Sequence, residues 1–146
     1  MNGKILLDTN ILVYIYDPLD RKKQDRAIEI VDKLIRTNRA LISTQVIGEF
    51  FMATTRAKRQ LLTPAEALQR MRNYLAACQV VDVTQLISLE AIRGVETHKF
   101  WFWDAQIWAT ARLNQILEVY SEDFNSGSII EGVRFTNPLT DDFELP

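Results

Sequence analysis

The 146-residue sequence contains a single cysteine, Cys78, and a single histidine, His98. One cysteine excludes an intrachain disulfide, and this pair excludes a zinc site built from several Cys and His ligands. No apolar run approaches the ~20 residues that a transmembrane helix needs. The start of the chain also lacks the basic and long apolar segments of a secretory signal. We therefore expect a cytoplasmic protein with no membrane partner.

Repeats, low-complexity tracts and obvious linkers are absent as well. The hydrophobic fraction of 47% and the charged fraction of 25% are ordinary for a globular protein. A chain of this length can bury a substantial core. We expect one domain over residues 1–146.

The formal net charge of -2 conceals a segregation of charge along the chain. Between Arg21 and Arg72 the sequence has twelve Lys or Arg and five Asp or Glu, whereas the remainder has five basic and fourteen acidic residues. A basic segment of this kind favours a polyanionic partner. It is equally compatible with solvated basic helix faces, so charge alone leaves both interpretations open.

Short apolar segments alternate with segments of helical periodicity, which predicts an α/β fold with a parallel sheet covered on both faces. Asn10 is the expected N-cap of the first helix, and Thr63 to Glu66 has a capping-box pattern with Pro64 at the first helical position. The predicted strands span residues 4–7, 40–43, 79–83, 116–120 and 133–135. The predicted helices span residues 10–17, 21–37, 45–59, 64–77, 86–96 and 103–114.

Asp8 stands in the middle of an apolar run, KILLDTNILVYIYD at residues 4–17. Burying an unpaired carboxylate costs several kcal/mol, roughly, so this position needs an explanation. Asp8 and Asp123 both follow a predicted strand. Ligands of open parallel sheets bind beyond the carboxyl ends of the strands, so we expect these two side chains to meet there.

Glu49 and Asp104 lie on predicted helices beside apolar residues. Taken singly, each acid has a structural explanation: Asp8 caps a turn, Asp123 is a loop residue, Glu49 points to water and Asp104 suits a helix N-terminus. Taken together, four acids in a small volume repel one another unless a cation lies between them. An all-oxygen site suits Mg²⁺ or Mn²⁺, and its natural chemistry is phosphodiester hydrolysis.

Five segments spread over nearly the whole chain form a recognisable set. They are ILLDTNILVY (5–14), TQVIGEFF (44–51), FWDAQIWATA (102–111), YSEDFNSG (120–127) and IIEGVRFTNP (129–138). In this order and spacing they resemble PIN-domain ribonucleases, specifically the VapC toxins of bacterial type II toxin–antitoxin pairs. The resemblance implies a three-layer α/β/α sandwich with a short central parallel sheet, a divalent-metal site, RNA as substrate, an antitoxin that blocks the active site, and often a toxin homodimer.

The resemblance also implies roles for individual residues. Asp8 and Asp104 are the expected main metal ligands, and Asp123 and Glu49 complete the site, partly through water, or orient the nucleophile. Hydrogen-bond partners that hold these carboxylates are expected at Asn10, Ser121 and, as a weaker match, Thr9. Gln106 and Trp101 depart from the family pattern, which leaves the acids intact and affects local packing or partner contacts.

Outside the acids, three basic residues and an aromatic run attract attention. Arg56, Lys58 and Arg59 end a predicted helix, where they either suit the helix dipole or hold RNA phosphates. We expect Phe102 and Trp103 in the core and Trp101 exposed. His98 is interpreted as an ordinary residue between two helices.

Three functions compete with a toxin ribonuclease. A stand-alone PIN nuclease for RNA processing has the same chemistry, and a neighbouring gene for a small DNA-binding protein would favour the toxin instead. An aspartate-based phosphatase or phosphotransfer domain usually wants a second aspartate two residues after the first, where this chain has Asn10. The complete acid set argues against a non-catalytic RNA-binding module.

Overall fold

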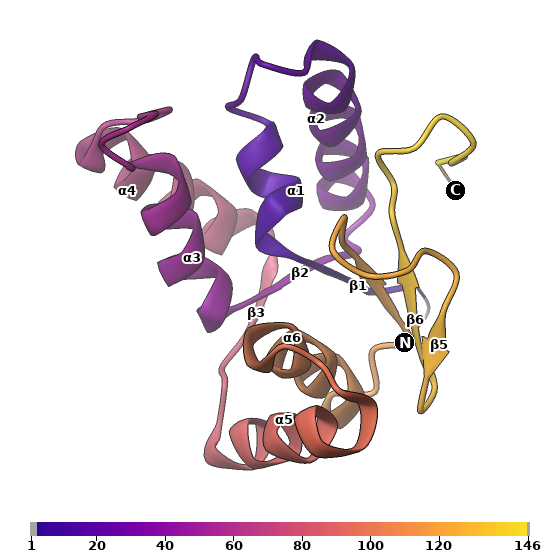
Figure 1. Cartoon of the computed structure of the whole chain (residues 1–146). Helices are drawn as coiled ribbons and strands as arrows, with labels where there is room; N and C mark the ends of the chain where they lie inside the picture. The colour runs from indigo at the N-terminus through magenta and orange to yellow at the C-terminus, as the bar shows by residue number, and fades with distance from the viewer. Residues whose placement is uncertain (1–2, 146) are drawn as a thin grey trace.

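A six-stranded sheet lies at the centre of the computed structural model, which describes residues 3–145 (Figure 1). Adjacent strands are parallel, except that β5 pairs with β6 in antiparallel fashion. The strands are short and β1 and β2 are wholly buried, as expected of a parallel sheet covered on both faces. In sheet order they are β3 (Gln79–Val81), β2 (Ala40–Ser43), β1 (Ile5–Leu7), β4 (Glu118–Tyr120), β6 (Val133–Thr136) and β5 (Ile129–Ile130).

The helices form two layers, one on each face of the sheet (Figure 1). One layer holds α1 (Thr9–Tyr14), α2 (Arg21–Arg36), α3 (Thr44–Thr54) and α4 (Pro64–Ala77), and the other holds α5 (Gln85–His98) and α6 (Phe102–Leu113). This arrangement confirms the predicted three-layer α/β/α sandwich. None of the helices in residues 3–145 is long and apolar enough to cross a membrane.

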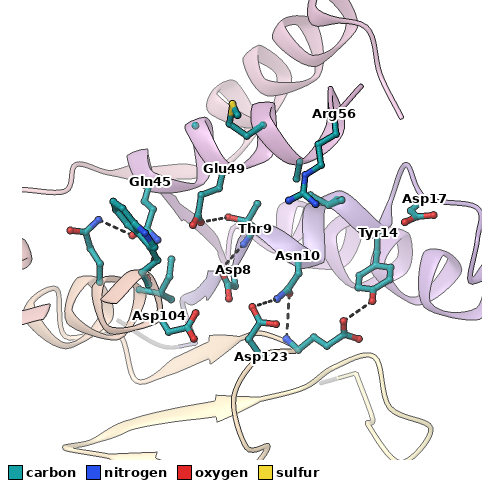
Figure 2. A pocket seen from close by; sticks show the side chains of 18 of the residues that line it. Asp8, Thr9, Asn10, Tyr14, Asp17, Gln45, Glu49, Arg56, Asp104 and Asp123 are labelled. Carbon is teal, nitrogen blue, oxygen red and sulfur yellow. Dashed lines mark hydrogen bonds between the residues drawn. The ribbon is translucent and has the colours of Figure 1, made fainter. Parts of the chain in front are cut away.

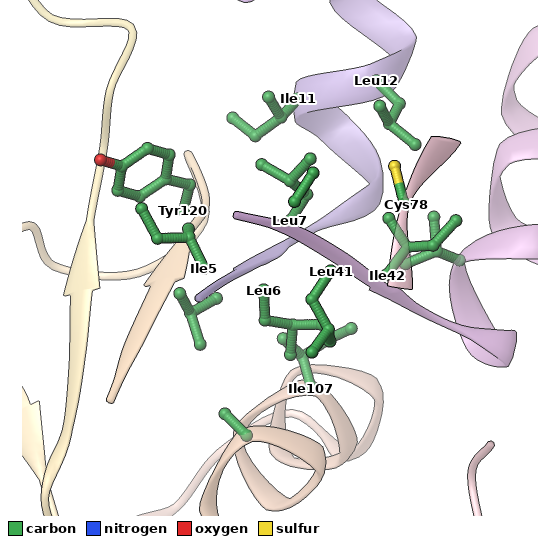
Figure 3. Packing of buried hydrophobic residues seen from close by; sticks show 14 of the residues in the cluster. Ile5, Leu6, Leu7, Ile11, Leu12, Leu41, Ile42, Cys78, Ile107 and Tyr120 are labelled. Atoms are coloured by element: carbon green, nitrogen blue, oxygen red, sulfur yellow. The ribbon is translucent and has the colours of Figure 1, made fainter. Parts of the chain in front are cut away.

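The core lies on both faces of β1, because successive strand residues point to opposite sides. Leu6 lies on the same side as Leu41 and as Ile107 of α6, whereas Leu7 faces Ile11 of α1 (Figure 3). All five side chains are buried, and each contributes about 1.5–3 kcal/mol of hydrophobic stabilisation. Burial of β1 therefore fixes the position of Asp8, which follows the strand at the polar edge of the sheet.

The first helix begins earlier than predicted, and its N-cap is Asp8 rather than Asn10. Asp8 has an extended backbone, and its Oδ1 accepts a hydrogen bond from the Thr9 amide at 2.8 Å. The prediction was wrong because β1 ends at Leu7 and the helix starts without an intervening loop. The Asn10 side chain is consequently free to reach across to the residues after β4.

The helix predicted over residues 45–59 ends at Thr54 instead. The Thr54 and Thr55 hydroxyl groups donate back to the carbonyls of Phe50 and Phe51, which favours the end of a helix. The Leu61 and Leu62 amides then bond to the Thr54 carbonyl. Arg56, Lys58 and Arg59 thus lie in the loop that follows α3, not on its last turn.

The hairpin of β5 and β6 was predicted only in its second strand. Its two-residue turn places Glu131 and Gly132 at φ values of 48° and 87°, the left-handed pair that a tight hairpin requires. His98, expected between two helices, is instead the last residue of α5. Its Nε2 lies 2.6 Å from the Glu131 carboxylate, so it joins α5 to this turn.

The expected single domain over residues 1–146 stays a prediction, and residues 1, 2 and 146 lie outside the described residues.

Candidate active site

The carboxyl ends of β1 and β4 lie side by side and bring Asp8 close to Ser121. Leu7 pairs with Tyr120, and the Asp8 amide bonds to the Tyr120 carbonyl at 3.0 Å. The Ser121 hydroxyl donates to Asp8 Oδ2 at 2.7 Å. Both oxygens of the Asp8 carboxylate therefore accept a hydrogen bond, one from the Thr9 amide and one from Ser121. Asp8 and Ser121 are 113 residues apart in sequence.

Asp8 is only 5% exposed, so its charge is poorly solvated. This burial, with smaller contributions from the negative charges of Asp123 and Glu49, raises the pKa of Asp8 to about 7. The hydrogen bonds from Ser121 and the Thr9 amide act in the opposite direction, because they stabilise the carboxylate. An acid with such a pKa is half neutral near pH 7 unless a cation stabilises its charged form.

Asp104 lies in the first turn of α6 and is partly buried. Burial and then the charges of Asp123 and Glu49 raise its pKa to about 6. Among the described residues, no donor bonds to the Asp104 carboxylate. Its oxygens are consequently available to a ligand.

Glu49 and Asp123 are each held by a residue of α1. The Thr9 hydroxyl donates to Glu49 Oε1 at 2.7 Å, and Asn10 Nδ2 donates to Asp123 Oδ2 at 3.0 Å (Figure 2). Asn10 also accepts a hydrogen bond from the Glu122 amide, and the Asp123 amide donates to Ser121. The first turn of α1 thus positions acids from α3 and from the segment after β4.

All four predicted acids line one pocket of about 950 Å³ at this edge of the sheet (Figure 2). Thr9 and Asn10 line it too, while Ser121 lies buried behind Asp8. Arg56 and Arg59 also line the pocket, whereas Lys58 is exposed outside it. Of the predicted site residues, Lys58 is therefore the one that neither lines the pocket nor bonds to one of its acids.

The donor set fits a hard divalent cation. Four carboxylates with two raised pKa values form a region of crowded negative charge, which Mg²⁺ or Mn²⁺ would relieve. Within residues 3–145, no three Asp, Glu, His or Cys side chains already stand close enough to enclose an ion. Ligation hence requires side-chain rotation or bridging water, and Mg²⁺ characteristically keeps several waters.

A second group of polar residues at the pocket rim was not predicted. Glu122 accepts hydrogen bonds from the Tyr14 hydroxyl at 2.5 Å and from Lys23 Nζ at 2.6 Å. This contact ties α1 and α2 to the segment that carries Asp123. The sequence offered one signal, since Glu122 directly precedes a candidate ligand, but Tyr14 and Lys23 are remote in sequence.

Three polar side chains form a hydrogen-bonded chain beside Asp104. The Ser88 hydroxyl donates to Gln106, Gln106 Nε2 donates to Gln45 Oε1, and Gln45 Nε2 donates to the Trp103 carbonyl at 3.0 Å. This chain joins the starts of α3, α5 and α6. It explains how Gln106, noted as a departure from the family pattern, is buried without an unpaired amide.

The structure contradicts one of the three aromatic predictions. Trp103, expected in the core, is 49% exposed and lines the pocket, whereas Phe102 is partly buried and packs against the core. The first turn of α6 lies at the pocket edge, so it cannot bury both rings. Trp101 is 71% exposed, as expected.

Comparison with known proteins identifies the class. The model of the PIN domain family matches residues 5–125, and the chain therefore belongs to the PIN domain family. No curated protein sequence matched it.

Solved structures of toxins have the same fold. The chain is similar to VapC20 of Mycobacterium tuberculosis, a toxin that cleaves the sarcin-ricin loop, with 21% identity, a TM-score of 0.65, and coverage of 90% of this chain and 99% of that one. A toxin–antitoxin complex from Klebsiella pneumoniae is 20% identical, with a TM-score of 0.64 and coverage of 92% and 98%. DNA-bound VapBC from Salmonella typhimurium is 19% identical, with a TM-score of 0.66 and the same coverage.

Proposed function

We propose that this PIN domain is a metal-dependent endoribonuclease that hydrolyses RNA phosphodiester bonds and acts as the toxin of a type II toxin–antitoxin pair. The observation that carries the proposal is the convergence of Asp8, Glu49, Asp104 and Asp123 on one pocket. Family membership and the fold shared with VapC toxins support it.

Asp8 and Asp104 would hold Mg²⁺ or Mn²⁺, with Asp123 and Glu49 completing the site, partly through water. When bound, such an ion activates water and stabilises the departing oxygen of a phosphodiester. Hydrogen bonds from Ser121, Asn10 and Thr9 keep the carboxylates in place. Arg56 and Arg59 lie on the same pocket and are suited to the phosphates that flank the scissile bond.

The toxin assignment brings a protein partner into the proposal. Neighbouring structures are toxin–antitoxin complexes, and we infer an antitoxin that covers this pocket. A stand-alone PIN nuclease in RNA processing is the second candidate, and a gene for a small DNA-binding protein next to this one would decide between them. The expected homodimer and cytoplasmic location stay predictions, and Asn10 at the position of a second aspartate argues against the phosphotransfer alternative.

The direct test is to incubate the purified protein with total cellular RNA and Mg²⁺ or Mn²⁺, and to map the new 5′ ends. We expect discrete cleavage sites that disappear in EDTA and in Asp104→Asn. The matched control is Asp25→Asn, which neutralises an exposed acid of α2 outside the pocket. Near-wild-type cleavage by folded Asp104→Asn would refute the assignment of the site.

A further inference from the structure

We infer that the pocket contains a binding subsite for one unpaired RNA base, next to the acids and formed by Trp103, Gln45 and Gly48. The inference rests on the proposed ribonuclease function, because it takes single-stranded RNA as the ligand. It goes further by naming what part of the RNA is recognised and by which side chains. Five observations on the described residues carry it.

The pocket is larger than a metal-bound phosphate requires. Its volume of about 950 Å³ lies near the upper end of the ~300–1,000 Å³ typical of small-molecule sites. The acids occupy one region of it. Gln45 and Arg56 lie on opposite sides of Glu49 (Figure 2), so the pocket extends along α3 in both directions from the acids.

The two ends of this extension differ in chemistry. Arg56 and Arg59 line one end. Arg59 is already paired with Asp17, whereas Arg56 forms no ion pair with the described residues. The other end lies at the start of α3, where Gln45 donates to the Trp103 carbonyl and Thr44 accepts from the Val83 amide. Trp103 and Val83 line the pocket there, and the lining has no basic side chain besides Arg56 and Arg59. Phosphate suits the first end, whereas the flat apolar face of a base suits the second.

Trp103 provides a surface on which a base can stack. Its indole is 49% exposed on the pocket although it belongs to the first turn of a helix that is otherwise mostly buried. Its backbone is held by the Gln45 amide, and Phe102 packs edge-on against its ring with centroids 4.9 Å apart. An exposed ring fixed in this way stacks on any base, because every base has a π-face.

Gly48 leaves space in the lining of the pocket. It lies inside α3, where glycine costs about 1 kcal/mol relative to alanine. A Cβ at Gly48 would meet no atom within 4 Å, so no packing contact of the described residues explains the glycine. Since Gly48 lines the pocket directly before Glu49, an absent side chain here keeps room for a ligand near the acids.

Gln45 adds a polar contact at the same end. Its Oε1 accepts from Gln106 and its Nε2 donates to the Trp103 carbonyl, which fixes the orientation of the amide. One hydrogen of Nε2 has no partner among the described residues. It is suited to a carbonyl oxygen on the edge of a base.

The test measures binding of a 5′-fluorescein single-stranded RNA of eight nucleotides by anisotropy, in EDTA so that cleavage does not interfere. We expect Trp103→Ala to weaken binding by about 5- to 150-fold, as for loss of one stacked base, and Trp103→Phe to retain most of the affinity. Trp101→Ala is the matched control. It removes a more exposed tryptophan outside the pocket, and its affinity should stay within about twofold of wild type.

Two further measurements make the result specific. Gly48→Leu should weaken RNA binding without lowering the melting temperature, because the new side chain meets no protein atom near its Cβ and fills the pocket. A series of RNAs, each with one abasic nucleotide, then identifies the stacked base. At the position whose base stacks on Trp103, wild type and Trp103→Ala should bind with equal affinity, because there is no base left to stack. Gly48→Leu also tests the subsite if Trp103→Ala fails to fold.

The outcomes separate this inference from the proposed function. Wild-type affinity in both folded Trp103→Ala and Gly48→Leu would overturn the base subsite, even if the protein cleaves RNA, and would leave the exposed indole to a protein partner. Loss of RNA affinity in both variants would support the subsite even if no metal promoted cleavage, and in that case the nuclease function alone would fail.

Discussion

The hydroxyl group of Ser121 donates to Asp8 Oδ2 at 2.7 Å, and so the residue after β4 holds the carboxylate after β1. We predict that Ser121→Ala weakens Mn²⁺ binding by about 10- to 100-fold, as is usual for losing a partner of a metal ligand. The measurement is the Mn²⁺ concentration that raises the melting temperature by half of its maximum. Ser128→Ala, which removes a hydroxyl that donates to the Asn125 carbonyl outside the pocket, serves as the control. Equal Mn²⁺ dependence of both variants would contradict the role given to Ser121.

Without metal, the stability of the protein should fall as the pH rises from about 5 to 7, above the range in which carboxyl groups with a lowered folded pKa, such as Glu131, gain stability with pH. The folded-state pKa values of Asp8 and Asp104 are raised to about 7 and about 6, chiefly by burial. A carboxyl group with a raised folded pKa destabilises the fold above its unfolded value of roughly 4, and the penalty is complete above the folded pKa. Thermal unfolding in EDTA across this range checks the prediction, and a melting temperature that rises from pH 5 to 7 would contradict it.

Asp104→Asn should change stability in opposite directions without and with metal. In EDTA at pH 7, we expect Asp104→Asn to be more stable than wild type by about 1 kcal/mol, a figure reduced for the partial exposure of Asp104. In excess Mn²⁺ the wild type should be the more stable protein, because the ion binds only the folded site and the variant lacks a ligand. Melting curves of both proteins in both buffers suffice. The same order in EDTA and Mn²⁺ would mean that Asp104 is only a helix-end residue.

The basic residues after α3 should contribute unequally to RNA binding. Arg56 lines the pocket and Lys58 does not. Arg56→Ala should therefore reduce the slope of log affinity against log salt by about 0.7, the value for one phosphate contact on a single strand. Lys58→Ala should leave the slope unchanged, and it is the natural control because it removes the same charge two residues away. Identical slopes for the two variants would show that neither residue contacts phosphate in the pocket.

Two glycines in helices should respond oppositely to alanine. At Gly94, buried in α5, a Cβ would lie 2.7 Å from the ring of Trp108, so Gly94→Ala should destabilise the fold by about 1–3 kcal/mol. Gly48→Ala meets no atom within 4 Å and should stabilise it by about 0.5–1 kcal/mol. Urea unfolding of the two variants measures both values. A stabilising Gly94→Ala would mean that α5 and α6 separate easily.

The sequence predicted the parts of this molecule that depend on local patterns. Buried strands are short apolar runs, and the ends of parallel strands share an edge, so the meeting of Asp8 and the segment near Asp123 followed from strand positions alone. The four acids were predicted for the same pocket, and the structure places them there. Whether they hold an ion is a question for the experiments above.

The features that were missed depend on contacts between remote segments. The end of α3 at Thr54 depends on amides of Leu61 and Leu62, which helical periodicity does not include. The exposure of Trp103 follows from a pocket that forms only when α3 and α6 come together, and hydrophobicity alone favoured a buried ring. Tyr14 and Glu122 are 108 residues apart, so no local pattern links them.

The pairing of β1 with β4 has a consequence for the timing of synthesis. Asp8 is synthesised well before Ser121, which follows it by 113 residues, and before Asp123. At about 5–20 residues per second, the 113 residues that separate Ser121 from Asp8 take roughly 6–23 s to add. A nascent chain therefore carries an incomplete site until the segment after β4 has been made. The ribonuclease proposed above would thus be inert during that interval, and would become active only after β4 has paired with β1.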